Sequence, residues 1–223
     1  MPNTRRSANR VFRWLAVSAA LATIVFGLAG QWTDPWLWAY VAIFAAAGLY
    51  AALSIEDDLA RERFRPPDPG ADRGALRVIR LVALSQLIFG ALDAGRWHLT
   101  PVPDSLRLVG AAGMIFGLAL LFHAMTTNRF FSAVVRIQGD RGHHVIDRGP
   151  YAIVRHPGYV GMIVSVPFGA LVLGSWIGVA LAVAYAALML RRVIFEDAFL
   201  RANLTGYERY AARVRYRLVP GVW

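Results

Sequence analysis

The chain has 223 residues, 57% of them hydrophobic, and a mean hydropathy of +0.45, more apolar surface than a soluble fold can hide. The formal net charge is +10, and all 24 strongly basic side chains are arginine because the chain has no lysine. These arginines flank long apolar runs instead of forming a stripe on a soluble module, which favours lipid head groups and argues against nucleic acid as a partner. Without cysteine, disulfides and thiolate chemistry are excluded.

Apolar runs in the first half of the chain predict four membrane-spanning helices, at residues 14–30, 35–54, 76–95 and 106–125. The second run follows the first after a short polar link, which favours a hairpin of membrane helices over a cleaved leader. Between the second and third runs lies a charged segment rich in proline and glycine. That segment is typical of an amphipathic helix end followed by a loop.

The last apolar run, residues 159–190, is longer than one membrane span requires. A single helix crosses the hydrocarbon core with about 20 residues. The middle of this run carries a proline and several glycines, and we expect it to form two helices with a tight turn near Gly174 and Ser175. The run therefore predicts a C-terminal helical hairpin.

The arginines also predict the orientation in the membrane. With a cytoplasmic N-terminus, every arginine except Arg96 and Arg107 falls on the cytoplasmic side, as the positive-inside rule favours. The fold class predicted is therefore all-α: a polytopic membrane protein with about four N-terminal transmembrane helices and a C-terminal hairpin. Both termini are expected in the cytoplasm. Residues 1–127 would form the transmembrane part, and residues 128–223 a cofactor-binding catalytic region with an amphipathic tail.

Two polar segments bracket the hairpin, so its ends would bring them together in space. The first contains His143, His144 and His156, which lack cysteine neighbours and the i, i+4 spacing of two ligands on one helix face. We therefore expect no metal site. No phosphate-binding glycine loop and no GxSxG elbow occurs, which leaves kinase, dehydrogenase and serine hydrolase chemistry without support.

The same segments carry a combination of motifs: "GPYAIVRHPGYVG", then the hairpin, then "RRVIFEDAFL" and "GYERYAARVRYRLVPGVW". From about residue 128 to 223 the chain resembles the isoprenylcysteine carboxyl methyltransferase family. That family belongs to a wider group with phospholipid N-methyltransferases and methanethiol S-methyltransferases, which are integral membrane enzymes that use S-adenosylmethionine without a Rossmann domain. The acidic pair here is Glu196–Asp197, where the family has two glutamates.

The resemblance implies S-adenosyl-L-methionine as the cofactor, in a pocket that faces the cytoplasm, and Arg192 as the catalytic contact to the substrate. The cofactor-binding residues that it implies are His143, His144, Val145, Ile146, Tyr151, Arg155, His156, Pro157, Gly158, Tyr159 and Glu196. Their chemistry agrees with this role. An arginine fork and a histidine can donate to the methionine carboxylate, tyrosine rings attract a sulfonium, and the start of a helix favours an anion.

The expected reaction is O-methylation of the carboxylate of a lipophilic, isoprenylcysteine-like substrate that enters from the bilayer. A carboxylate is already ionised, and no general base is evident in the sequence. Methylation of a phospholipid amine or a small thiol is the alternative within this chemistry, and a non-enzymatic anion-binding membrane protein is the alternative outside it. Arg155 could also serve only as a positive-inside residue, and Glu196 only as an ion-pair partner of Arg192.

Overall fold

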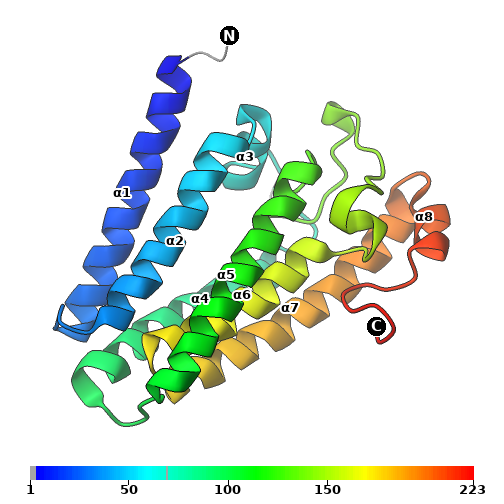
Figure 1. The fold of residues 1–223 in the computed structure, drawn as a ribbon. Helices are drawn as coiled ribbons and strands as arrows, with labels where there is room; N and C mark the ends of the chain where they lie inside the picture. The colour runs from blue at the N-terminus through cyan, green and yellow to red at the C-terminus, as the bar shows by residue number, and fades with distance from the viewer. Residues whose placement is uncertain (1–3, 69) are drawn as a thin grey trace.

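The computed structural model describes residues 4–68 and 70–223 of the chain, and within these ranges the secondary structure is helical (Figure 1). The only extended pairing found there is a bridge between Pro101 and Ser175. The α-helices are α1 (Thr4–Ala29), α2 (Pro35–Ser54), α3 (Asp57–Phe64), α4 (Arg73–Leu92), α5 (Asp104–Thr127), α6 (Pro157–Leu173), α7 (Trp176–Asn203) and α8 (Tyr207–Arg213). A π-helical turn, Asp93–Trp97, continues α4, and two 3-10 turns, Gly139–Arg141 and Gly149–Ala152, lie between α5 and α6.

Five of these helices are long and apolar enough to span a membrane: α1, α2, α4 with its π-helical turn, α5 and α7. The sixth apolar helix, α6, has only 17 residues and lies beside α5 and α7. Many side chains on the long helices point outward and are apolar, as a lipid environment requires. The chain is a multi-pass membrane protein, and the prediction of an all-α polytopic fold is confirmed.

The C-terminal hairpin turns where the sequence predicts. Gly174 has a φ of 93°, in the left-handed region that glycine adopts without strain, and it ends α6. Ser175 then caps α7, its side chain accepting a hydrogen bond from the backbone N–H of Gly178. Two short, well-defined caps thus separate α6 from α7 without a loop between them.

Helix α6 packs most extensively against α5, and glycine makes this possible. A Cβ atom on Gly117 of α5 would lie 2.6 Å from the backbone nitrogen of Ser165, and one on Gly161 of α6 would lie 2.6 Å from the carbonyl oxygen of Gly117. Small residues let membrane helices approach this closely, where van der Waals packing replaces the hydrophobic effect as the driving force. The backbones of α5 and α6 are therefore in direct contact.

The two ends of the helix bundle differ. At one end lie α3, the last turn of α5, the start of α6, the C-terminal part of α7 and α8 (Figure 1). The opposite end holds the turns between α1 and α2 and between α6 and α7. There the buried carboxylate of Asp93 accepts hydrogen bonds from the hydroxyls of Ser175 (2.6 Å) and Thr100 (2.5 Å). These hydrogen bonds join the end of α4 to the turn between α6 and α7. The candidate site lies at the other end of the bundle, beside α3 and α8.

Candidate active site

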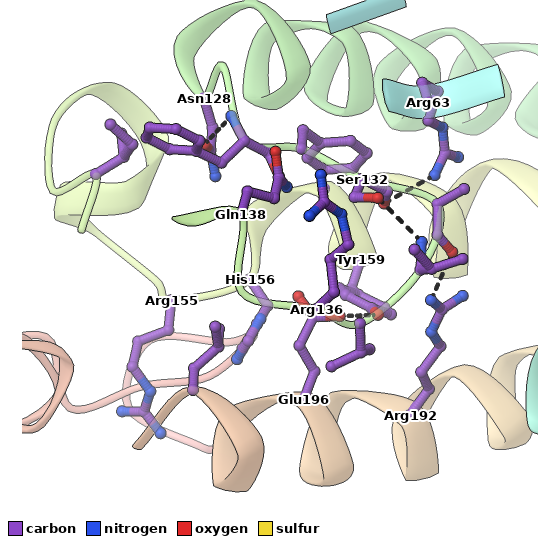
Figure 2. A pocket seen from close by; sticks show the side chains of 18 of the residues that line it. Arg63, Asn128, Ser132, Arg136, Gln138, Arg155, His156, Tyr159, Arg192 and Glu196 are labelled. Atoms are coloured by element: carbon purple, nitrogen blue, oxygen red, sulfur yellow. Dashed lines mark hydrogen bonds between the residues drawn. The ribbon is translucent and has the colours of Figure 1, made fainter. Parts of the chain in front are cut away.

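A cavity of about 270 Å³ lies at the end of the bundle that α3 and α8 cover. Its walls come from α3, α4, α6, α7, α8 and the segment between α5 and α6 (Figure 2). The volume is close to the lower end of the ~300–1,000 Å³ typical of small-molecule sites. Polar and apolar side chains both line it.

The start of α6 forms one wall of the cavity. Pro157 occupies the first turn of the helix, where its missing N–H costs nothing, and Gly158 follows with no side chain because a Cβ there would lie 2.3 Å from the ring of Phe131. This turn directs Tyr159 towards α7, where its hydroxyl donates to the carboxylate of Glu196 at 2.5 Å (Figure 2). The Arg155–Gly161 motif thus places the hydroxyl of Tyr159 beside the carboxylate of Glu196 on α7.

Asp197, the second member of the acidic pair, is a buried hub that holds the same region together. Its carboxylate accepts two hydrogen bonds from Arg155, at 2.7 and 3.2 Å, and one from the hydroxyl of Tyr207 at 3.0 Å. His156 Nε2 lies 3.3 Å from the same carboxylate, and Arg217 donates to it at 3.1 Å. A buried carboxylate is stable only when paired in this way.

Arg155 is therefore engaged within the protein. Besides Asp197, its guanidinium donates to the carbonyl oxygens of Val214 and Arg215 in the tail, and Figure 2 shows it directed away from Tyr159. His156 keeps its Nδ1 free of described hydrogen-bond partners, since both of its side-chain contacts involve Nε2. Arg155 links α7 to the tail, and His156 retains one ring nitrogen for a ligand.

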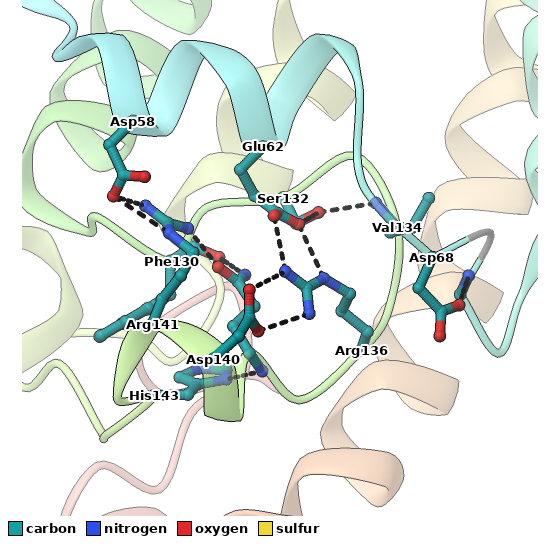
Figure 3. A network of polar contacts seen from close by, with 12 residues as sticks. Asp58, Glu62, Asp68, Phe130, Ser132, Val134, Arg136, Asp140, Arg141 and His143 are labelled. Atoms are coloured by element: carbon teal, nitrogen blue, oxygen red, sulfur yellow. Dashed lines mark hydrogen bonds and ion pairs between the residues drawn. The ribbon is translucent and has the colours of Figure 1, made fainter.

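Helix α3 fixes the segment between α5 and α6 through ion pairs (Figure 3). Glu62 pairs with Arg136 at 2.7 Å, Arg136 also pairs with Asp140 at 3.0 Å, and Asp58 pairs with Arg141 at 2.5 Å. Burial alone would raise the pKa of Glu62, but hydrogen bonds from Arg136 and Ser132 outweigh it and hold the pKa below its ordinary value. Glu62 is thus an anion at neutral pH and anchors Arg136.

The same segment places His143 against the cavity. Its Nδ1 accepts a hydrogen bond from the backbone N–H of Gln138 at 3.2 Å, and the buried side chain of Gln138 donates to the carbonyl oxygen of Phe130 at 2.7 Å. Burial, with the nearby positive charge of Arg136 and Arg141, lowers the pKa of His143 to about 4. At neutral pH this imidazole is uncharged and can keep accepting that hydrogen bond.

The structure brings the predicted site residues together with one exception. The residues of the predicted set that line the cavity are His143, His144, Val145, Ile146, Tyr151, Arg155, His156, Gly158, Tyr159, Arg192 and Glu196. Pro157 is fully buried at the start of α6 and is not among the lining residues. The alternative of an Arg192–Glu196 ion pair is not observed. Arg192 instead pairs with Asp72 (Nε to Oδ2, 2.9 Å) and donates to the carbonyl oxygen of Ala133 at 2.7 Å.

Several lining residues come from parts of the chain in which the sequence shows no site motif. Arg63 of α3 and Arg80 of α4 belong to the N-terminal half, and each reads as an ordinary positive-inside residue. Asp72, which positions Arg192, stands in a loop rich in proline and glycine. The sequence offers a signal for Asp72 alone, which is a charged side chain directly before the start of α4.

Across the described ranges, 4–68 and 70–223, no group of three or more histidine or acidic side chains is arranged to hold a metal ion. The chemical content of the cavity is a carboxylate and tyrosines near the start of α6 and the C-terminal part of α7, and arginines towards α3 and α4. Such a cavity can bind a positively charged group near the carboxylate and, at its other end, an anionic group near the arginines.

Comparisons with known proteins find one matching family model and several partial relatives. Residues 108–202 match the model of the isoprenylcysteine carboxyl methyltransferase (ICMT) family. The "Cobalt-zinc-cadmium resistance protein CzcN" of Cupriavidus metallidurans is 28% identical over 141 residues, which cover 63% of this chain and 60% of that protein. A "Probable protein-S-isoprenylcysteine O-methyltransferase" of Oryza sativa subsp. indica is 31% identical over 109 residues, 48% of this chain and 57% of that protein. The chain thus spans about 60% of the length of these relatives.

A solved structure of the eukaryotic intramembrane Ras methyltransferase ICMT, determined without a monobody, has a similar fold. The TM-score is 0.60, and the match covers 94% of this chain and 76% of that chain at 18% sequence identity. Nearly all of the present chain, including its N-terminal helices, therefore follows the same arrangement of helices.

Proposed function

We propose, from the match between residues 108–202 and the model of the isoprenylcysteine carboxyl methyltransferase family, that this membrane protein is an S-adenosylmethionine-dependent methyltransferase. The reaction proposed is O-methylation of the carboxylate of a lipophilic, isoprenylcysteine-like substrate. One observation carries the proposal. Residues from the segments at both ends of the hairpin, among them His143, Tyr159, Arg192 and Glu196, line a single cavity.

The lining residues suit the cofactor chemically. Glu196 can hold an ammonium group or a ribose diol, and the free Nδ1 of His156 can hydrogen-bond to the same end of the ligand. Val145 and Ile146 offer apolar contact to an adenine ring. The ring of Tyr159, which lines the cavity, could attract a sulfonium. When bound, S-adenosylmethionine supplies a methyl group activated by the positive sulfur.

The protein's part in such a reaction is alignment and the exclusion of water. Arg192 can bind the acceptor carboxylate with its planar fork, and Asp72 and the carbonyl oxygen of Ala133 fix that fork in place. Holding two reactants in line can lower a barrier by roughly 7–11 kcal/mol. An amine or thiol acceptor would also have to lose a proton, whereas a carboxylate needs no base.

The location of the site follows from the distribution of charge. The cavity lies at the end of the bundle that carries nearly all the arginines, so we place it, with both termini, on the cytoplasmic side. A lipophilic acceptor would reach it from the bilayer between helices. The cofactor would come from the cytoplasm.

The cofactor site is tested by calorimetric titration of the detergent-purified protein with S-adenosylhomocysteine. We expect binding by the unmodified protein, and a loss of roughly 1.5–3 kcal/mol in each of the variants His156→Ala and Glu196→Gln. Arg191→Ala, an exposed neighbour on α7 outside the cavity, is the matched control and should bind normally. Unchanged affinity in both site variants would remove the proposed cofactor pocket.

The substrate half of the proposal is tested at Arg192 with a labelled-methyl assay on prenylcysteine substrates. Arg192→Ala should leave the affinity for S-adenosylhomocysteine almost intact while turnover falls at least about 100-fold, since a charge-assisted contact to the acceptor is lost. Arg192→Lys should recover little because a point charge does not reproduce the bidentate fork. Near-normal turnover in both variants would mean that Arg192 supports the fold and does not contact the acceptor.

A further inference from the structure

Five arginines line the cavity, and three of them come from three different helices: Arg63 of α3, Arg80 of α4 and Arg192 of α7. Arg63 Nη1 donates to the carbonyl oxygen of Ser132 at 3.1 Å, and Arg192 Nη2 donates to that of the next residue, Ala133, at 2.7 Å. Two guanidinium groups thus approach consecutive peptide units, from α3 on one side and from α7 on the other (Figure 2). The basic part of the cavity is built around residues 132–133.

The positive charges there are only partly balanced. Within the described ranges, Asp72 is the one carboxylate that forms an ion pair with any of the three arginines, and its partner is Arg192. Burial, together with the charge of Arg192, lowers the pKa of Arg63. Like charges held together in a partly dry site are costly unless an anion lies between them. Each guanidinium has five N–H donors, and most remain unused by protein acceptors.

Arg63 is held in position although no carboxylate in the described part of the chain forms an ion pair with it. Its guanidinium carbon lies 5.3 Å from the centroid of the Phe131 ring, a cation–π distance, and its hydrogen bond to Ser132 fixes a second direction. Arg80 differs because it is exposed, on a helix that continues into the membrane-spanning part. Arg63 is therefore suited to direct contact with an anion, and Arg80 to attraction at the mouth of the cavity.

An apolar wall adjoins the three arginines. Ile79 of α4 and Tyr185 and Met189 of α7 pack into one buried cluster, and all three also line the cavity. Ala83 and Met162 extend this surface along the helices. A ligand that fills this part of the cavity would carry an anionic group among the arginines and a hydrocarbon portion against this wall.

We propose that Arg63 and Arg80 are acceptor-binding residues that complete, with Arg192, a site for the anionic group of an amphiphilic carboxylate. This inference rests on the proposed function and deepens it. It assigns recognition of the acceptor to α3 and α4 of the N-terminal half, outside the motifs that resemble the family. Neutral or cationic acceptors, such as amines, would be rejected by the same arginines.

The test compares binding of two probes to the full-length protein saturated with S-adenosylhomocysteine. One probe is an N-acylated, S-prenylated cysteine with a free carboxylate, and the other is its primary carboxamide, which has the same shape without the charge. We expect the unmodified protein to prefer the carboxylate by at least about 10-fold, and Arg63→Gln to remove most of that preference. Arg80→Gln should weaken carboxylate binding only about threefold, and this effect should shrink in high salt because the side chain is exposed.

Arg61→Gln on α3 and Arg77→Gln on α4 are the matched controls, because both arginines are exposed and lie outside the cavity lining. Each variant should keep its affinity for S-adenosylhomocysteine, which shows that it has folded. If Arg63→Gln alone loses that affinity, Arg63→Lys, which keeps the charge, takes its place and should retain part of the preference. An unmodified protein that binds S-adenosylhomocysteine but does not prefer the carboxylate would overturn this proposal. A protein that fails to bind S-adenosylhomocysteine would overturn the proposed function instead.

Discussion

At the scale of single residues, His143 couples the cavity to pH. Its pKa is lowered to about 4 by burial and nearby positive charge, whereas an unfolded histidine titrates near 6.5. A histidine with a lowered pKa contributes stability that is complete above about pH 6.5 and is lost as the pH falls towards 4. Protonation would also remove the acceptor that Gln138 uses, so the segment that lines the cavity would loosen in acid.

We therefore expect the free energy of unfolding to fall by about 1–2 kcal/mol between pH 6.5 and pH 5, as thermal unfolding in detergent would measure. His143→Asn, which keeps a hydrogen-bond acceptor but does not titrate, should flatten this dependence. His98→Asn is the matched control and should behave like the unmodified protein, because His98 is exposed and lies outside the cavity lining, and asparagine tolerates its left-handed backbone. If the His143 variant had the same pH profile as the unmodified protein, the loss in acid would come from the titration of another group.

The sequence predicts residues of the site best where chemistry is local. The Arg155–Gly161 motif and Glu196 could be placed because their spacing matches a known pattern and a helix start explains it. Sequence reasoning did not reveal that Arg155 is occupied by Asp197 and by tail carbonyls, or that Arg63 reaches Ser132. These contacts join residues 42 to 69 positions apart, and packing of whole elements decides them.

At the scale of elements, the contact between α5 and α6 sets the position of the cavity wall. A side chain on Gly117 or Gly161 would meet backbone atoms at 2.6 Å, and a helix backbone cannot yield as a flexible side chain can. Gly117→Val or Gly161→Val should therefore lower the stability by about 3 kcal/mol. Thermal unfolding in detergent measures this loss. Gly27→Ala on α1, where a Cβ meets nothing within 4 Å, is the control and should be neutral or slightly stabilising.

Retention of the unfolding temperature in both valine variants would mean that α5 and α6 can separate without cost. The bounds of α2, α4 and α5 were predictable to within about three residues, because apolar length is a strong signal. The polar ends of α1 and α7 were missed, since α1 begins at Thr4 and α7 continues to Asn203, beyond the apolar runs at 14–30 and 159–190. The π-helical turn after α4 was not predictable. It depends on Asp93 meeting Ser175 and Thr100, and the sequence shows none of these as partners.

At the scale of the whole molecule, the chain offers a direct test of orientation because it contains no cysteine. A single cysteine placed at Leu99, which is 68% exposed at the end opposite the cavity, should react with a membrane-impermeant maleimide added to intact cells. A single cysteine at Arg209, exposed on α8, should react only after the cells are permeabilised. The physical reason is the concentration of arginine at the end that carries α8.

The reverse labelling pattern would place both the termini and the cavity outside the cytoplasm. Labelling of both cysteines in intact cells, with an intact membrane shown by a cytoplasmic marker, would contradict a fixed orientation. The cysteine at Leu99 also controls for reagent access, since it lies away from the cavity and from every residue assigned to it.

The hub at Asp197 has a consequence for how this sequence can change over evolutionary time. Arg155, Tyr207 and Arg217 come from separate segments, yet each depends on the same buried carboxylate. A single replacement at position 197 removes the acceptor that Arg155, Arg201 and Arg217 share, and a replacement of Arg155 removes the most buried of the cations that balance it, so most one-step paths pass through a damaged intermediate. Substitutions at these positions should therefore occur together in related sequences, although up to 62 residues separate the positions in the chain.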